Sequence, residues 1–141
     1  MSNLKLFLKE NRKVRENKKY APTRAFVDEN GKALEWEFRP LDSKEVEQIR
    51  EDNTYEVSVE GNPNMYRPKT NSKKIIEDMI IAAVVEPNLF DQELQDSYGV
   101  MTPNDLLHEL VEVPGEYDDL GKFIQEMNGY SLVQKVEQAK N

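Results

Sequence analysis

The spacing of apolar residues changes part-way along this chain, and that change limits the fold more than any other feature. Between residues 34 and 39 apolar and charged side chains alternate, which is typical of a strand with one buried face. From residue 72 onward the apolar residues recur every three or four positions, the period of an amphipathic helix. We therefore predict an α+β fold, in which an N-terminal β-hairpin or small antiparallel sheet packs with four to five α-helices.

The dipeptide Asn30-Gly31 marks the turn of the predicted hairpin, because both residues tolerate the positive φ angles of a type I′ turn. A two-residue turn at this point places Val27 opposite Leu34. The next pair on the same face is then Ala25 and Trp36. This alternation assigns the Trp36 side chain to the core rather than to a binding surface.

Several helices carry explicit start signals. Asp42 and Glu45 are spaced as the N-cap and N3 residues of a capping box. Thr102, Pro103 and Asp105 are the residue types expected at N-cap, N1 and N3. The expected elements are a short helix over 3–16, a helix over 42–52, an edge strand over 55–60, a loop over 61–70, and helices over 72–85, 90–98, 102–113 and 116–127.

A chain of 141 residues has the length of one ordinary domain. We expect a single domain over residues 1–141, with four parts. They are a basic N-terminal arm or short helix (1–16), a hairpin, helix and edge strand (18–60), a helical part (72–128) and a polar tail (129–141).

The residue inventory argues against catalysis. There is no cysteine, and His108 is the only histidine, which removes thiolate sites and multi-histidine metal sites. No glycine-rich phosphate loop or Gly-x-Ser-x-Gly elbow occurs. The carboxylates lack the pattern of a calcium loop and are interpreted as solvated surface. We predict no enzyme, no catalytic residue, no cofactor and no metal.

Charge is distributed unevenly. Residues 1–24 contain eight Lys or Arg against two Glu, whereas the segment from Glu86 to Glu126 contains eleven acids and one base, Lys122. With a net charge of −8 overall, the body is strongly acidic and should repel nucleic acid and anionic membranes. The longest apolar run, Met79 to Val85, falls far short of the roughly 20 residues that span a bilayer. We expect a cytoplasmic protein with no membrane partner, for which nucleic acid is an improbable ligand.

Leu89 and Phe90 lie between Pro87 and an acidic helix, where an apolar pair is most easily left exposed. We predict these two residues as the partner-binding contact. The alternative, that they belong to the core, stays open at this point.

Three central segments, in this order, resemble one known family. They are Val84-Val85-Glu86-Pro87-Asn88-Leu89, Glu93-Leu94-Gln95-Asp96-Ser97-Tyr98-Gly99-Val100 and Val113-Pro114-Gly115-Glu116-Tyr117. The similarity extends to Phe7–Asn11, Phe26–Lys32 and Glu35–Arg39. The chain resembles the tail assembly chaperones of phages and prophages, in particular the XkdN-like family of contractile-tailed Bacillus prophages. It departs from that pattern between Tyr55 and Arg67, where related chains are more basic and this one carries Glu56 and Glu60.

The resemblance implies a non-enzymatic function in tail assembly. Such a chaperone keeps the long, apolar, helical tape-measure protein soluble until tube subunits polymerise around it. The implied partners are the tape-measure protein and, as a further possibility, the tail-tube protein.

Two other functions remain open at this stage. One is a structural or adaptor role in the tail. The other is RNA-binding regulation through the basic arm, by Lys5, Lys9, Arg12, Lys13, Arg15, Lys18 and Lys19. The sequence leaves the oligomeric state open.

Overall fold

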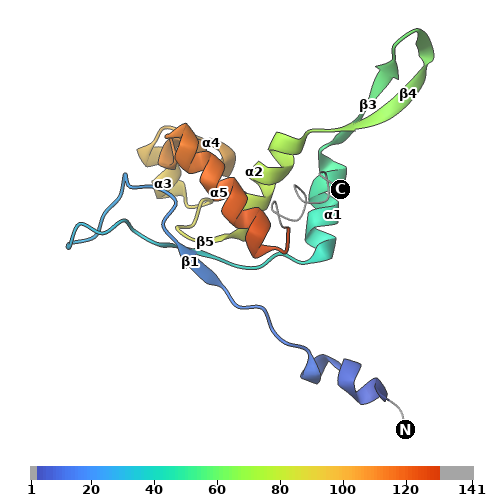
Figure 1. Ribbon diagram of the computed structural model, residues 1–141. Helices are drawn as coiled ribbons and strands as arrows, with labels where there is room; N and C mark the ends of the chain where they lie inside the picture. The colour runs from blue at the N-terminus through green and yellow to red at the C-terminus, as the bar shows by residue number, and fades with distance from the viewer. Residues whose placement is uncertain (1–2, 131–141) are drawn as a thin grey trace, which may run out of the picture.

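The computed structural model describes residues 3–130. It consists of small antiparallel sheets and α-helices (Figure 1). The elements in chain order are η1 (Asn3–Phe7), η2 (Lys9–Asn11), β1 (Lys18–Tyr20), β2 (Trp36–Phe38), α1 (Ser43–Asp52), β3 (Thr54–Val59), β4 (Asn62–Thr70), α2 (Ser72–Ala83), β5 (Val84–Glu86), α3 (Gln92–Ser97), α4 (Pro103–Leu110) and α5 (Pro114–Met127). The predicted α+β class is confirmed. Most of the predicted polar tail, residues 131–141, lies outside the described residues, as do residues 1 and 2 of the predicted arm.

The first sheet has the strand order β1-β2-β5, with both pairs antiparallel. Tyr20 pairs with Trp36 and Phe38 pairs with Val84. An N-terminal hairpin is therefore present, but its predicted register was wrong. Val27 bridges Ala33 rather than Leu34. The turn is longer than two residues because the Asp28 carboxylate accepts hydrogen bonds from the backbone N–H groups of residues 30 and 32.

Trp36 also pairs differently from the prediction, opposite Tyr20 instead of Ala25. The chain after Tyr20 does not continue the pairing with β2, because Thr23 and Arg24 bind the distant Glu116 carboxylate. The Thr23 hydroxyl donates to Oε1 at 2.9 Å, and the backbone N–H of Arg24 donates to Oε2 at 2.9 Å. A side chain some ninety positions away thus sets the register of this hairpin.

The core lies between the sheet and helices α2, α4 and α5. Trp36 and Phe38 enter it from β2, and the assignment of Trp36 to the core is confirmed. The Phe123 ring stacks on Tyr20 at 4.3 Å between centroids and meets Phe38 edge-on at 5.1 Å. The remaining buried apolar residues are Leu41, Val46, Met79, Ile80, Ala83, Leu89, Leu106, Leu107, Leu110, Val111, Leu120 and Ile124.

Two of the predicted helix starts are confirmed by their hydrogen bonds. The Asp42 side chain accepts from the Glu45 N–H at 2.8 Å, and the Glu45 side chain accepts from the Asp42 N–H at 3.2 Å. The Thr102 hydroxyl accepts from the Asp105 N–H at 3.1 Å, with Pro103 at N1. Each bond satisfies a backbone donor that the first helical turn leaves without an intrahelical partner.

We expect the substitution Asp42→Ala to lower the free energy of unfolding by about 1 kcal/mol, because it removes the N-cap bond at the start of α1. Urea denaturation followed by circular dichroism measures this change. Glu47→Ala, at an exposed position of the same helix, is the control and should change stability by less than about 0.5 kcal/mol. Equal effects of the two substitutions would contradict the role of the cap.

Two predicted helix boundaries were wrong. Helix α2 ends at Ala83 rather than Val85, because residues 84–86 pair with β2. Pro114 was predicted to end the preceding helix, but it begins α5 at N1, where proline costs no backbone hydrogen bond. Helix α4 itself ends at Leu110.

The predicted loop over residues 61–70 is a strand. β3 and β4 form a two-stranded antiparallel hairpin that projects from the body (Figure 1). Every residue of β4 is exposed, so this strand has no apolar alternation that could reveal it. Pro63 and Pro68 also weigh against a strand, although an open two-stranded ribbon tolerates proline on its free edges.

The predicted helix over residues 3–16 is replaced by two short 3₁₀ turns, η1 and η2, neither with a buried residue. Leu4, Phe7 and Leu8 are exposed instead of packing against the body. A short helix without tertiary contacts is marginal, which explains the difference. We use the term arm for residues 3–16, which extend away from the body in Figure 1. No helix among residues 3–130 has both the length and the apolar character needed to cross a bilayer.

Candidate functional site

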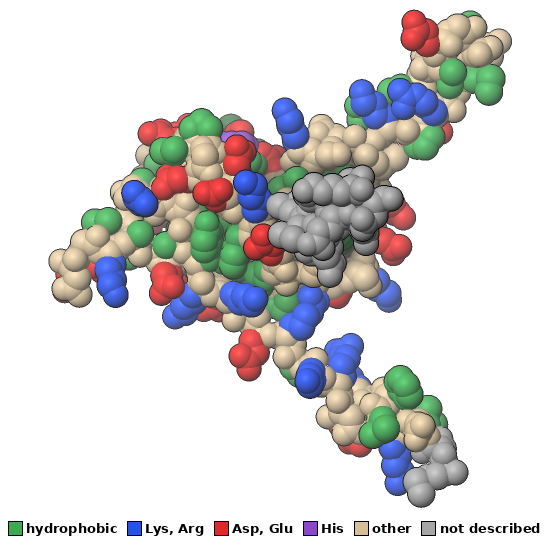
Figure 2. Space-filling model, in the orientation of Figure 1, with side chains coloured by type: hydrophobic (Ala, Val, Ile, Leu, Met, Phe, Trp, Pro, Cys, Tyr) green, Lys and Arg blue, Asp and Glu red, His purple; other side chains and the backbone are tan. Residues whose placement is uncertain are grey.

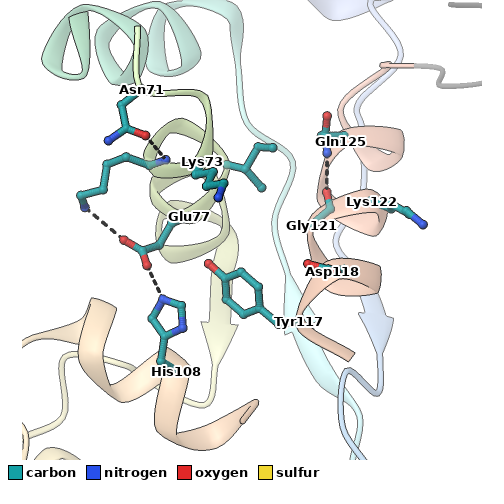
Figure 3. A pocket seen from close by; sticks show the side chains of 11 residues that line it. Asn71, Lys73, Glu77, His108, Tyr117, Asp118, Gly121, Lys122 and Gln125 are labelled. Carbon is teal, nitrogen blue, oxygen red and sulfur yellow. Dashed lines mark hydrogen bonds and ion pairs between the residues drawn. The ribbon is translucent and has the colours of Figure 1, made fainter. Parts of the chain in front are cut away.

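A hollow of about 790 Å³ opens between helices α2, α4 and α5 (Figure 3). Ile76 and Glu77 reach it from α2, His108 from α4, and Tyr117 and Gly121 from α5. Helices α2 and α5 approach closely here, because a Cβ on Gly121 would lie 3.2 Å from the Ile76 Cγ2 atom. The hollow therefore marks the place where three helices converge.

Glu77 is the centre of a polar network in this hollow. Its Oε1 atom lies 2.5 Å from His108 Nε2, and its Oε2 atom lies 3.2 Å from Lys74 Nζ and accepts a hydrogen bond from Asn104 at 2.9 Å. Burial raises the pKa of the Glu77 carboxyl, but the hydrogen bonds from Asn104, His108 and Lys74 outweigh it and lower the pKa overall. The carboxylate thus ties α2 to α4.

Asp78 extends the network toward α1. Its carboxylate accepts from Lys74 Nζ at 2.7 Å and from the side-chain amides of Asn53 at 3.0 Å and Asn104 at 3.2 Å. Burial raises its pKa, and the bonds from Lys74, Asn53 and Asn104 lower it further than burial raises it. Both carboxylates are therefore already engaged by donors of the chain itself, which suits a clamp between helices.

His108 takes part in this clamp through its ring as well. The imidazole stacks on the Tyr117 ring at 4.7 Å between centroids and 21° between planes. Burial raises the pKa of Tyr117 to about 12, assisted by the charges of Glu77, Asp118 and Asp78. Across residues 3–130 no three His, Asp or Glu side chains gather in a way that could hold a metal ion.

The structure separates the two residues that were predicted as the partner contact. Leu89 is buried with 1% of its surface exposed, and its carbonyl accepts a hydrogen bond from the Gln95 side chain at 2.8 Å. Phe90 is 67% exposed. Leu89 therefore belongs to the core, contrary to its predicted exposure, and only Phe90 offers a side chain to a partner. Partner binding at Phe90 stays a prediction.

Sequence reasoning missed other exposed apolar side chains. Tyr55, Met65 and Tyr66 lie on the β3–β4 hairpin, and Phe7 and Val14 lie on the arm. Figure 2 shows green side chains at both projections. The available sequence signal was the position of the apolar pair Met65-Tyr66 between Pro63 and Pro68, because proline is confined to the exposed edges of sheets.

Comparison with known proteins agrees with the motifs. The family model described as "Phage XkdN-like tail assembly chaperone protein" matches residues 4–140. The chain belongs to this family. The resemblance proposed from the sequence is thereby confirmed, and the protein is a member of a phage tail assembly chaperone family.

Two proteins of Bacillus subtilis (strain 168) are similar to this chain. One is the "Phage-like element PBSX protein XkdN", 25% identical over 122 residues that cover 84% of this chain and 80% of the relative. The other is the "Uncharacterized protein YqbN", 26% identical with the same coverage. The crystal structure of the protein yqbn superimposes with a TM-score of 0.74 and 18% identity, covering 93% of this chain and 99% of that chain. At that identity the likeness shows a shared fold.

Proposed function

We propose that this protein is a non-enzymatic chaperone that binds the tape-measure protein of its phage and keeps it soluble in the host cytoplasm during tail assembly. The observation that carries the proposal is the family match, which spans residues 4–140 rather than one motif. The wider statement, a function in tail assembly, follows from the family. The choice of the tape-measure protein as partner is our inference.

The physical properties of the chain support this proposal. A protein that holds a long helical client needs apolar contacts for the client's apolar stripe and enough charge to keep the complex with the client in solution. The net charge is −8, and apolar side chains are exposed on Phe90 and on the β3–β4 hairpin at Met65 and Tyr66. We assign the client contact to these residues.

Co-expression with the tape-measure protein of the same genome tests the proposal. We expect most of the tape-measure protein to move from the insoluble to the soluble fraction and to co-purify with a tag on this chain. The substitutions Phe90→Ser and Tyr66→Ser should each reduce the co-purified amount severalfold, because each removes an exposed aromatic anchor.

Val27→Ser is a matched control, since Val27 is also exposed but lies in the turn region of the first hairpin. It should leave the yield of complex unchanged. A tape-measure protein that stays as insoluble with this chain as without it would overturn the proposed partner.

A further inference from the structure

The cations of residues 3–19 have no anionic partner among residues 3–130. Seven Lys or Arg residues lie between residues 3 and 19, against two Glu. None of the seven takes part in an ion pair within residues 3–130, where the pairs involve Arg39, Lys74 and His108. The same stretch carries exposed apolar side chains, of which Phe7 is 83% exposed. The stretch is therefore basic and partly apolar, and its cations form no ion pair among residues 3–130.

A second hollow, of about 600 Å³, offers the complementary chemistry. Glu112, Val113, Glu116 and Asp119 line one wall, and residues 20–25 line the other, so that three acids stand against one cation, Arg24. We call it the acidic hollow. The acids Glu112 and Asp119 are exposed and form no ion pair with any cation between residues 3 and 130. Apolar Val113 is 49% exposed beside them.

Two carboxylates that line the acidic hollow, Asp119 and Glu116, act electrostatically on Tyr20 at the opposite wall. Burial raises the pKa of the Tyr20 hydroxyl, and the charges of Asp119 and Glu116 raise it further. Glu116 is already engaged by Thr23 and the Arg24 backbone. Glu112 and Asp119 are thus the carboxylates left for a ligand, next to an apolar surface.

The arm of a given molecule points away from its own acidic hollow. The arm leaves the N-terminal end of β1, whereas the hollow begins at the other end of that strand, at Tyr20. Two bonds hold this direction: the Arg15 guanidinium donates to the Leu41 carbonyl, and the Asn17 amide donates to Glu37 at 2.9 Å. Figure 1 shows the arm extending from the side of the body away from α3 and α4. Docking within one molecule would require breaking these bonds and reversing the chain.

We propose that the arm of one copy docks in the acidic hollow of a second copy. Lys9, Arg12 and Lys13 then lie beside Glu112 and Asp119, and the exposed Phe7 of η1 covers Val113. Opposite charges favour this encounter and set its orientation, and the apolar contact adds affinity. The inference concerns association between copies of this chain and does not depend on which client the chaperone binds.

Sedimentation velocity of the purified full chain over a range of concentrations tests the proposal. We expect reversible association that weakens as salt is raised, because ion pairs at an exposed surface are screened. The triple variant K9E/R12E/K13E and the double variant E112K/D119K should each weaken association by about tenfold or more. All five positions are exposed, so urea denaturation should show stabilities close to that of the unaltered chain.

A mixture of the two variants separates docking between copies from docking within one. The reversed arm of the first variant matches the reversed hollow of the second, so the mixture should form a hetero-complex that neither variant forms alone. K73E, which reverses an exposed cation on α2, is the matched control and should not change association. An unaltered chain that is monomeric at every concentration, association insensitive to both reversals, or a mixture without hetero-complex would each overturn the proposal.

Discussion

Replacing Phe38 by alanine should lower the free energy of unfolding by about 3–5 kcal/mol, the largest loss that we expect from one substitution. The ring is fully buried, and it lies within a group of aromatic rings formed with Tyr20, Trp36 and Phe123. Removing it takes apolar surface out of the core and leaves a cavity where β2 meets α5. The central position of β2, between β1 and β5, limits how far the structure can relax into that cavity.

Urea or thermal denaturation followed by circular dichroism measures this loss. A domain has about 5–15 kcal/mol of stability in total, so this loss removes a large fraction of it. Phe90→Ala removes the same ring from an exposed position and serves as the control, with a change below about 0.5 kcal/mol. Similar losses from both substitutions would mean that the sheet does not form the centre of the core.

Glu77→Gln should lower the free energy of unfolding by about 1.5–3 kcal/mol at neutral pH, the range for hydrogen bonds to a charged group. The carboxylate is largely buried, with 14% of its side chain exposed, and it receives bonds from Lys74, Asn104 and His108. Glutamine keeps the shape but cannot supply the charge. Helices α2 and α4 would then lose the centre of the network that joins them.

The effect of Glu77→Gln should depend on pH in a defined direction. The pKa of Glu77 in the folded chain is lower than its ordinary value of 4.5. Its contribution to stability is therefore fully present above the unfolded-state pKa and is lost as the pH falls through the folded-state pKa. We expect the stability difference between the original chain and the variant to shrink as the pH falls below about 4.5.

Denaturation curves between pH 3 and pH 8 measure this dependence. Glu109→Gln is the control, because Glu109 is exposed on α4 and belongs to none of the ion pairs of residues 3–130. It should cost less than about 0.5 kcal/mol at every pH. A stability difference for Glu77→Gln that persists unchanged at pH 3 would show that the network does not depend on the charge of this carboxylate.

Helix starts were predictable from the sequence because their determinants lie within four residues of one another. The capping box at Asp42 and Glu45 and the Thr102 cap formed as expected. The end of α3 also follows from a local rule, since Gly99 has a φ of 67°, the left-handed conformation that glycine adopts without strain. Local hydrogen bonds of this kind form in the same way whatever the rest of the chain does.

The predicted partner contact was harder to judge from the sequence, because the burial of a side chain depends on neighbours that are distant in the sequence. Leu89 and Phe90 are adjacent and both apolar, yet one is in the core and the other is exposed. The Gln95 side chain donates a hydrogen bond to the Leu89 carbonyl, and the Leu89 side chain is buried. No pattern within the two residues distinguishes them, and therefore they were predicted together.

The α+β class, the helix caps and the uneven charge could all be derived from the sequence, because each depends on local spacing or on counting residues. Three features could not be derived in this way: the register of the first hairpin, the projecting β3–β4 ribbon and the extended arm. Glu116 sets the first across more than ninety positions, and the other two have no buried face to leave a periodic signal. Long-range contacts, or their absence, act only in the folded chain, so the sequence pattern alone could not place these elements.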